Sequence, residues 1–153
     1  MYAASARLAK GCGSPRWLGT DVGDMVIGLG MDLVEVARIR GAVDKHGDRF
    51  LKRVFTADEL AYCLGRGQQR DESLAARYAA KEAAWKALGV PPALRWTDLE
   101  VTHARSGAAP SMRFTRLALD AARGLGVTTT LLTMTHAGGV AAAVVVLSGG
   151  TAP

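Results

Sequence analysis

The 153-residue sequence has few cysteines and no long apolar run, and each shortage excludes a class of protein. Cys12 and Cys63 are its two cysteines and form no CxxC motif, which argues against a disulfide framework or a structural zinc site and fits a reducing cytoplasm. No stretch reaches the roughly 18 apolar residues that a membrane-spanning helix needs. We therefore expect a cytoplasmic protein with no membrane partner.

Two common nucleotide-binding signatures are also missing. No GxxxxGK[ST] segment occurs, and the third glycine that a GxGxxG fingerprint would need after Gly28 and Gly30 is Leu33. The sequence therefore excludes the P-loop and Rossmann folds. Gly28 and Gly30 are better interpreted as positions where another part of the backbone passes close to a strand.

Acidic residues are outnumbered, because 19 Lys and Arg face 14 Asp and Glu, for a net charge of +5. This balance favours an anionic partner, which could be a nucleic acid, a phosphorylated cofactor or an acidic protein. A small basic nucleic-acid-binding protein is one hypothesis. Phe, Tyr and Trp make up only 6% of the residues, however, and no stacking platform or recognition-helix motif is present, so we expect no nucleic-acid partner.

The chain divides into an extension, one domain and a short tail. Residues 1–24 are basic and free of acids until Asp21, and Arg7 and Lys10 interrupt any run long enough for a secretory signal, so we expect a disordered or dispensable extension. Residues 25–148 are the right size for a single domain. The Gly/Ala-rich residues 149–153 are expected to form a flexible tail.

The hydrophobic pattern predicts an α+β fold. Residues 25–31 form an apolar strand that ends at Asp32, and a helix follows as far as Gly47. Thr56 and Glu59 form a capping box that opens a second helix. A third helix is expected over residues 72–88. Short strands follow at residues 99–102 and 111–114, then a helix over residues 115–125 and a hairpin that closes the domain.

The third helix contains the segment RYAAKEAAWKALG, in which Glu82 is the single acid. Tyr78, Glu82 and Lys86 recur every fourth residue, and a Glu to Lys pair at this spacing stabilises a helix by roughly 0.2–0.5 kcal/mol. A solvated helix face would therefore explain Glu82. Asp32 likewise stands where a helix N-terminus favours an acid.

Four segments together favour a functional interpretation: GLGMDLVEVARI, RVFTADEL, LAARYAAKEAAWKALG and TMTHAGGVAAAVVV. In this order and spacing they resemble the holo-acyl-carrier-protein synthase family of 4'-phosphopantetheinyl transferases, over nearly all of residues 25–147. The resemblance implies a small antiparallel sheet with a long packed helix, and a homotrimer whose cofactor site lies between subunits. It also implies transfer of the 4'-phosphopantetheine arm of coenzyme A to a serine of an apo acyl carrier protein, with Mg²⁺ as cofactor and adenosine 3',5'-bisphosphate as product.

The same resemblance assigns the acidic and basic site residues. Asp32 and Glu82 match the family's Mg²⁺ ligands, and Mg²⁺ is commonly held by one or two carboxylates plus substrate phosphates. Lys86, the third catalytic candidate, and Arg77 match positions that neutralise cofactor phosphates. Arg77 and Lys81 serve either the 3'-phosphate of coenzyme A or the fold.

Three further assignments follow from the resemblance. Gly89, where the long helix stops, and His136, at a strand end, are expected to bind the cofactor, and Arg38 matches a position that contacts the acidic carrier. Three groups are candidates for the general base: Glu82, Asp32 through a water, and a metal-bound water. A catalytically silent coenzyme A-binding relative is a further alternative, and the carrier could serve fatty-acid or polyketide synthesis.

Overall fold

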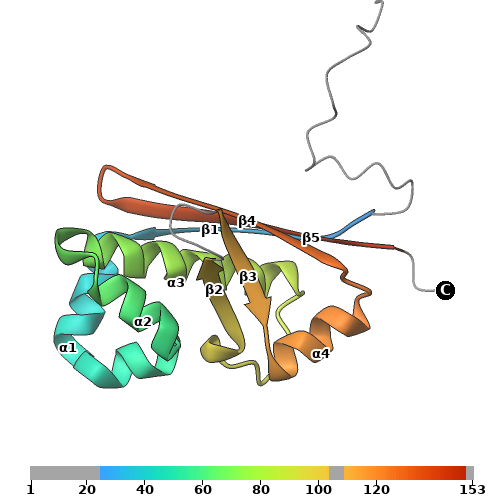
Figure 1. The fold of residues 1–153 in the computed structure, drawn as a ribbon, viewed down its shortest axis with the longest axis horizontal. Helices are drawn as coiled ribbons and strands as arrows, with labels where there is room; N and C mark the ends of the chain where they lie inside the picture. The colour runs from blue at the N-terminus through green and yellow to red at the C-terminus, as the bar shows by residue number, and fades with distance from the viewer. Residues whose placement is uncertain (1–24, 104–108, 151–153) are drawn as a thin grey trace, which may run out of the picture.

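The computed structural model describes residues 25–103 and 109–150, and the expected extension of residues 1–24 lies outside these ranges. It confirms the α+β class (Figure 1). In chain order the elements are β1 (Met25–Glu35), α1 (Val36–Val54), α2 (Ala57–Leu64), η1 (Gly67–Gln69), α3 (Arg70–Ala87), η2 (Trp96–Asp98), β2 (Leu99–His103), β3 (Pro110–Phe114), α4 (Arg116–Gly124), β4 (Thr129–Ala137) and β5 (Val140–Gly149).

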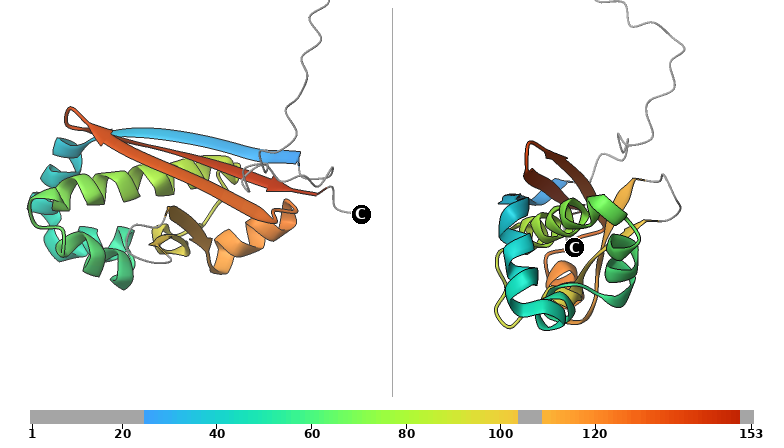
Figure 2. Two further views of the ribbon diagram at one scale, coloured as in Figure 1. Left: turned by 45° about the horizontal axis from the view of Figure 1, so that its top comes forward. Right: turned by 90° about the vertical axis from the view of Figure 1, so that its left-hand side faces the viewer.

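A three-stranded antiparallel sheet forms one side of the molecule, in the order β1-β5-β4. The predicted hairpin is its β4–β5 pair, whose turn places Gly138 and Gly139 at positive φ, a conformation that glycine adopts without strain. One face of the sheet contacts α3. Among the described residues no element covers the other face (Figures 1 and 2), and four large apolar side chains on it are between 50% and 66% exposed. These side chains are Leu29, Met31, Leu33 and Leu131.

Helix α3 lies along the inner face of the sheet and is buried mainly through alanines. Small residues allow the backbones to approach closely, and β1 contributes glycines at the contact. A Cβ atom at Gly30 would collide with the backbone of Ala83, and one at Gly28 with the backbone of Ala87. This bears out the interpretation of both glycines as sites of close backbone approach.

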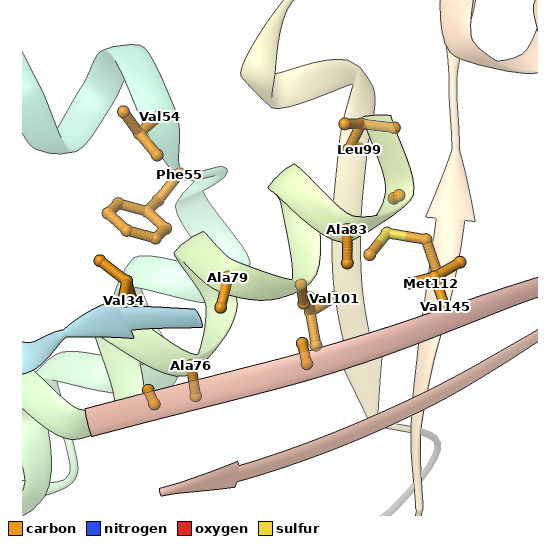
Figure 3. Close-up of a cluster of buried hydrophobic side chains, with 14 of the residues drawn as sticks. Val34, Val54, Phe55, Ala76, Ala79, Ala83, Leu99, Val101, Met112 and Val145 are labelled. Atoms are coloured by element: carbon orange, nitrogen blue, oxygen red, sulfur yellow. The ribbon is translucent and has the colours of Figure 1, made fainter. Parts of the chain in front are cut away.

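The remaining elements cover the other side of α3 (Figure 2). Helices α1 and α2 lie at one end, and the β2–β3 pair and α4 lie at the other. Together with the sheet they bury a core around α3 that includes Val34, Phe55, Ala83 and Leu99 (Figure 3). Within the described ranges no helix has both the length and the apolar character needed to cross a membrane.

Two local predictions had different outcomes. The capping box is confirmed, because Thr56 accepts the backbone N–H of Glu59, and the Glu59 carboxylate accepts the N–H of Thr56. The predicted helix end at Gly47 is confirmed only in part. Gly47 adopts φ 51° and ψ −136°, which kinks α1, but the helix resumes and continues to Val54. Phe50 and Leu51 pack against the core, and their burial favours this continuation.

Candidate active site

Asp32 lies on the inner face of β1, in a row with Gly28, Gly30 and Val34. The strand continues to Glu35, so Asp32 does not begin a helix. The strand–helix junction therefore lies three residues later than the predicted position at Asp32. Hydrogen bonds to β5 extend the strand through these positions. The carboxylate therefore faces α3 at the close β1–α3 contact, and a capping role for it is excluded.

Lys86 of α3 meets Asp32 at this contact. Its Nζ lies 2.8 Å from Oδ1 of Asp32 and donates a second hydrogen bond of 3.0 Å to the Met31 carbonyl oxygen. The Lys86 side chain is 49% exposed, whereas that of Asp32 is only 17% exposed. The helix-stabilising pair between Glu82 and Lys86 that their spacing allows is absent from the described residues, because Lys86 binds Asp32 instead.

Glu82 has a different partner, one helical turn earlier. The hydroxyl of Tyr78 donates to Oε1 of Glu82 over 3.3 Å. Burial, above all, raises the pKa of the Tyr78 phenol, the Glu82 and Asp32 charges raise it further, and the Arg38 charge opposes them. The phenol therefore stays protonated at neutral pH and acts as the donor. Its response to both acids and to Arg38 indicates that these side chains share one neighbourhood.

The donor set fits a hard divalent cation such as Mg²⁺, which prefers oxygen ligands. Within the described residues, Lys86 occupies Oδ1 of Asp32 and Tyr78 occupies Oε1 of Glu82, while Oδ2 and Oε2 have no hydrogen-bond partner. Each carboxylate thus keeps one oxygen uncommitted. No cluster of three or more His, Cys, Asp and Glu suited to a metal occurs in this part of the chain, so an ion here would need additional oxygens from substrate or water.

Lys81 lies in the core and not in the site. Its side chain is completely buried, and its Nζ lies 2.7 Å from Oε2 of the equally buried Glu59 and donates 3.0 Å to the Trp96 carbonyl. A further bond to the Leu99 carbonyl completes its coordination. These contacts favour a role in the fold, one of the two roles open to Lys81 from the sequence, and its binding to the cofactor stays a prediction.

Arg77 lies on the flank of α3 that faces away from Glu82. Its guanidinium stacks 4.1 Å from the centre of the Tyr62 ring, and its Nη2 lies 2.9 Å from Nε2 of His103. The side chain is buried, but it lines two adjoining pockets of about 130 and 340 Å³. His136 of β4 lines the smaller pocket, with its Nδ1 3.9 Å from Oε2 of Glu72.

The predicted site residues therefore form two groups within one chain. Asp32, Glu82 and Lys86 lie on the β1 flank of α3, whereas Arg77 and His136 lie on the β4 flank. Gly89 ends α3 with φ +79° just beyond Lys86, on the side of the first group. Arg38 is exposed near the start of α1 and its charge acts on Tyr78. These placements do not test the assigned roles.

The sequence did not reveal two contacts near the site and one ion pair in the core. Tyr78 was recognised only as part of a four-residue repeat, although an aromatic hydroxyl one turn before an acid is a detectable signal. His103 is not among the predicted site residues, yet its Nε2 lies 2.9 Å from Nη2 of Arg77. The partnership of Glu59 with Lys81 joins residues 22 positions apart, and no local pattern reveals it.

Comparison with known proteins supplies independent evidence. Residues 28–141 match the 4'-phosphopantetheinyl transferase superfamily. Holo-[acyl-carrier-protein] synthase of Anaeromyxobacter dehalogenans is 53% identical over 128 residues, which cover 82% of this chain and 98% of that protein. The crystal structure of holo-ACP-synthase from Plasmodium yoelii aligns with a TM-score of 0.73 and 25% identity, covering 84% and 99% of the two chains. The Helicobacter pylori holo-[acyl-carrier-protein] synthase in complex with coenzyme A aligns with a TM-score of 0.67 and 27% identity, covering 78% and 98%.

Proposed function

The chain belongs to the holo-[acyl-carrier-protein] synthases of the 4'-phosphopantetheinyl transferase superfamily, and we propose that it transfers the 4'-phosphopantetheine arm of coenzyme A to a serine of an apo acyl carrier protein in a Mg²⁺-dependent reaction. The observation that carries this proposal is the Asp32–Lys86 pair at the close β1–α3 contact, with Glu82 one helical turn before Lys86 and its charge acting on the same Tyr78 phenol as that of Asp32. Two acids and one flexible cation form the kind of site that binds a metal together with phosphates. The coenzyme A complex of the Helicobacter relative supports the same donor.

Asp32 and Glu82 would hold the Mg²⁺ ion through their uncommitted oxygens. When bound, the ion would neutralise negative charge on the cofactor pyrophosphate as the transfer proceeds. Without a cation, two neighbouring carboxylates repel each other. The Lys86 ammonium on Oδ1 of Asp32 offsets part of this repulsion in the chain alone.

Lys86 is positioned to bind a cofactor phosphate. Its side chain is half exposed, and its flexible stem lets the ammonium exchange Asp32 for a phosphate oxygen with little movement of the backbone. In the proposed reaction the carrier serine oxygen forms a bond to the β-phosphorus of coenzyme A, and the bond from that phosphorus to the bridging oxygen breaks. Adenosine 3',5'-bisphosphate leaves. The serine proton passes to Glu82, or through a water to Asp32.

The 130 Å³ pocket on the β4 flank would receive the 3'-phosphate of the same cofactor. Arg77 and His136 bring a guanidinium and an imidazole to its wall, and both donate to phosphate oxygens. Because α3 separates this pocket from Asp32 and Glu82, we propose that one coenzyme A spans two copies. It would contact the β1 flank of one copy and the β4 flank of the next.

A homotrimer would bring these flanks together. The uncovered face of the sheet supports self-assembly, because its exposed leucines and Met31 form a continuous apolar surface. In register, Leu29 lies across Val146 from Leu131, so the apolar surface extends over the full width of the sheet. Such a face is buried at low cost against equivalent faces of other copies.

Arg38 is proposed to receive the carrier protein. It is exposed on α1. Burial raises the pKa of Tyr78, the residue that binds Glu82, and the charge of Arg38 lowers it, so Arg38 lies in the neighbourhood of Glu82. An acidic carrier guided to this helix would deliver its serine beside the two carboxylates. Complementary charge of this kind mainly accelerates encounter and weakens with salt.

Intact-mass spectrometry of an apo acyl carrier protein tests the proposal. The carrier is incubated with the full chain, coenzyme A and Mg²⁺, beside a sample containing EDTA. We expect the carrier to gain the mass of one phosphopantetheine arm, and we expect EDTA to prevent the gain. No gain with several carriers, in a folded sample that binds coenzyme A, would indicate a catalytically silent relative.

A further inference from the structure

The side chain of Tyr78 lies between Glu82 and Trp96 of η2. Its hydroxyl donates to Oε1 of Glu82 over 3.3 Å, and its ring stacks on Trp96 with the ring centres 5.0 Å apart and the planes at 26°. Tyr78 is therefore the one described side chain that joins Glu82 to the body of the protein by a hydrogen bond.

The ring of Tyr78 is held in place by two successive aromatic contacts. The hydroxyl–carboxylate distance of 3.3 Å is longer than the usual range of about 2.5–3.0 Å for an O–H···O bond, so this weak bond depends on how firmly the ring is held. Trp96 stacks on this ring and makes a T-shaped contact with Trp85, with the ring centres 5.2 Å apart. Trp85 belongs to α3, as do Tyr78 and Glu82, so Trp96 of η2 packs against two aromatic side chains of the same helix. The carbonyl of Trp96 also accepts a bond from the buried Lys81.

The hydroxyl of Tyr78 affects which groups Glu82 and Lys86 can bind. Glu82 and Lys86 are one turn apart on α3, a spacing at which Glu and Lys ordinarily pair. With Oε1 occupied by Tyr78, Glu82 is satisfied by a neutral donor and keeps Oε2 free. Lys86 binds Asp32 instead. Loss of the hydroxyl would leave Glu82 free to rotate and to pair with Lys86, which would withdraw both residues from the site.

We propose that Tyr78 is a positioning residue, which holds the Glu82 carboxylate oriented for a divalent cation and keeps Lys86 from neutralising it. The inference rests on the proposed function for the identity of the site. Residues that orient a metal ligand in this way typically contribute about 10- to 100-fold in metal affinity.

Binding of Mn²⁺ to the full chain, measured by electron paramagnetic resonance of the free ion, tests the inference without any turnover. In the Tyr78→Phe variant, which removes only the hydroxyl, we expect Mn²⁺ affinity to fall about tenfold. The Mg²⁺ concentration for half-maximal transfer should rise by a similar factor, and the KM for the carrier at saturating Mg²⁺ should stay constant. Thr128→Val removes an exposed hydroxyl far from the site and should leave all three quantities at wild-type values.

A second variant separates positioning from folding. Trp96→Leu retains the Tyr78 hydroxyl but removes its stacking partner, and it should weaken Mn²⁺ binding by a smaller factor than Tyr78→Phe. A purely structural role for Tyr78 would lower the melting temperature without changing Mn²⁺ affinity, and that result would overturn the inference. Failure of the wild-type chain to modify any carrier would contradict the proposed function, whereas the Mn²⁺ titration would still decide the role of Tyr78.

Discussion

Lys86 binds the carboxylate of Asp32, 54 residues earlier in the chain, although Glu82 presents a carboxylate one turn away on the same helix. The ammonium joins α3 to β1 beside the glycine contact, where Gly30 meets the Ala83 backbone. A helix pair would have been the local choice. The observed pair joins two elements, and among the described residues each acid keeps one oxygen without a hydrogen-bond partner.

Removing the charge of Glu82 tests its role in catalysis. We expect Glu82→Gln to lower the Mg²⁺-dependent transfer rate by more than about 100-fold, the largest loss typical of a residue that only orients a metal ligand. The melting temperature should change little, since Glu82 is not in the core. The matched control is Glu35→Gln, because Glu35 is exposed and makes no side-chain capping bond. Near-normal transfer by the Glu82 variant would remove it from the site.

Reversing the charge at Arg38 tests carrier docking. Arg38→Glu should raise the KM for the carrier several-fold and leave the KM for coenzyme A unchanged, because the arginine is expected to attract the carrier and not the cofactor. The difference from wild type should shrink as NaCl is added. Arg123→Glu makes the same charge change on α4 and should leave both constants unaltered. Equal damage to both KM values would contradict the assignment.

A side chain at Gly30 should separate the two halves of the site. Gly30→Ala places a methyl group against the backbone of Ala83 and Ala87, and overpacking of this kind costs about 1–3 kcal/mol. We expect lower stability in urea unfolding together with reduced transfer. Gly41→Ala on α1 is the control, because nothing lies within 4 Å of its Cβ position, and it should be neutral or stabilising. Equal stability of the two variants would refute the close contact.

The buried pair of Lys81 and Glu59 should dominate stability. Lys81→Met leaves the Glu59 charge without its cation, and breaking a buried pair in this way costs about 3–5 kcal/mol. Lys52→Met breaks the exposed pair with Asp48, which we expect to cost at most about 1 kcal/mol. Free energies of unfolding in urea compare the two variants. Similar losses would indicate that burial of Lys81 contributes little.

Asp71 should contribute to acid unfolding. Burial alone would raise its pKa, but hydrogen bonds and charges from Arg40 and Arg70 outweigh burial and lower the pKa below the usual 3.8. The folded state therefore releases this proton more readily than the unfolded state. Its contribution is complete above about pH 4 and is lost as pH falls through the lowered pKa. The free energy of unfolding in urea, measured for wild type and Asp71→Asn over a series of pH values, tests this. Wild type should be the more stable of the two at pH 7, and the difference should disappear at the acid end of the series.

Local chemistry explains why parts of the fold could be predicted. The capping box at Thr56 depends on residues three apart, and the β4–β5 hairpin follows from apolar strands around Gly138 and Gly139. Glycine favours both a helix end and a kink, so the sequence predicted the break at Gly47 but not the helical turns after it, which the packing of residues 50 and 51 favours. The family was recognised from separated motifs, which no single periodicity contains.

The sequence could nominate candidate residues for the site but not their arrangement. Asp32 and Glu82 could be chosen from the resemblance. The pairing of Lys86 with Asp32 in place of Glu82 depends on how β1 lies on α3. Burial of Lys81 was equally hidden, since a lysine in an alanine-rich helix has the same local pattern whether it faces water or the core. Such outcomes are decided by tertiary contacts.

The separation by α3 of the two flanks proposed to bind phosphate would set how the number of complete sites depends on the number of copies. If each site combines the β1 flank of one chain with the β4 flank of the next, two chains joined by one such contact form a single complete site and leave two unmatched flanks. Three chains closed in a ring form three sites and leave none. Closure of the ring would thus give one complete site for every chain.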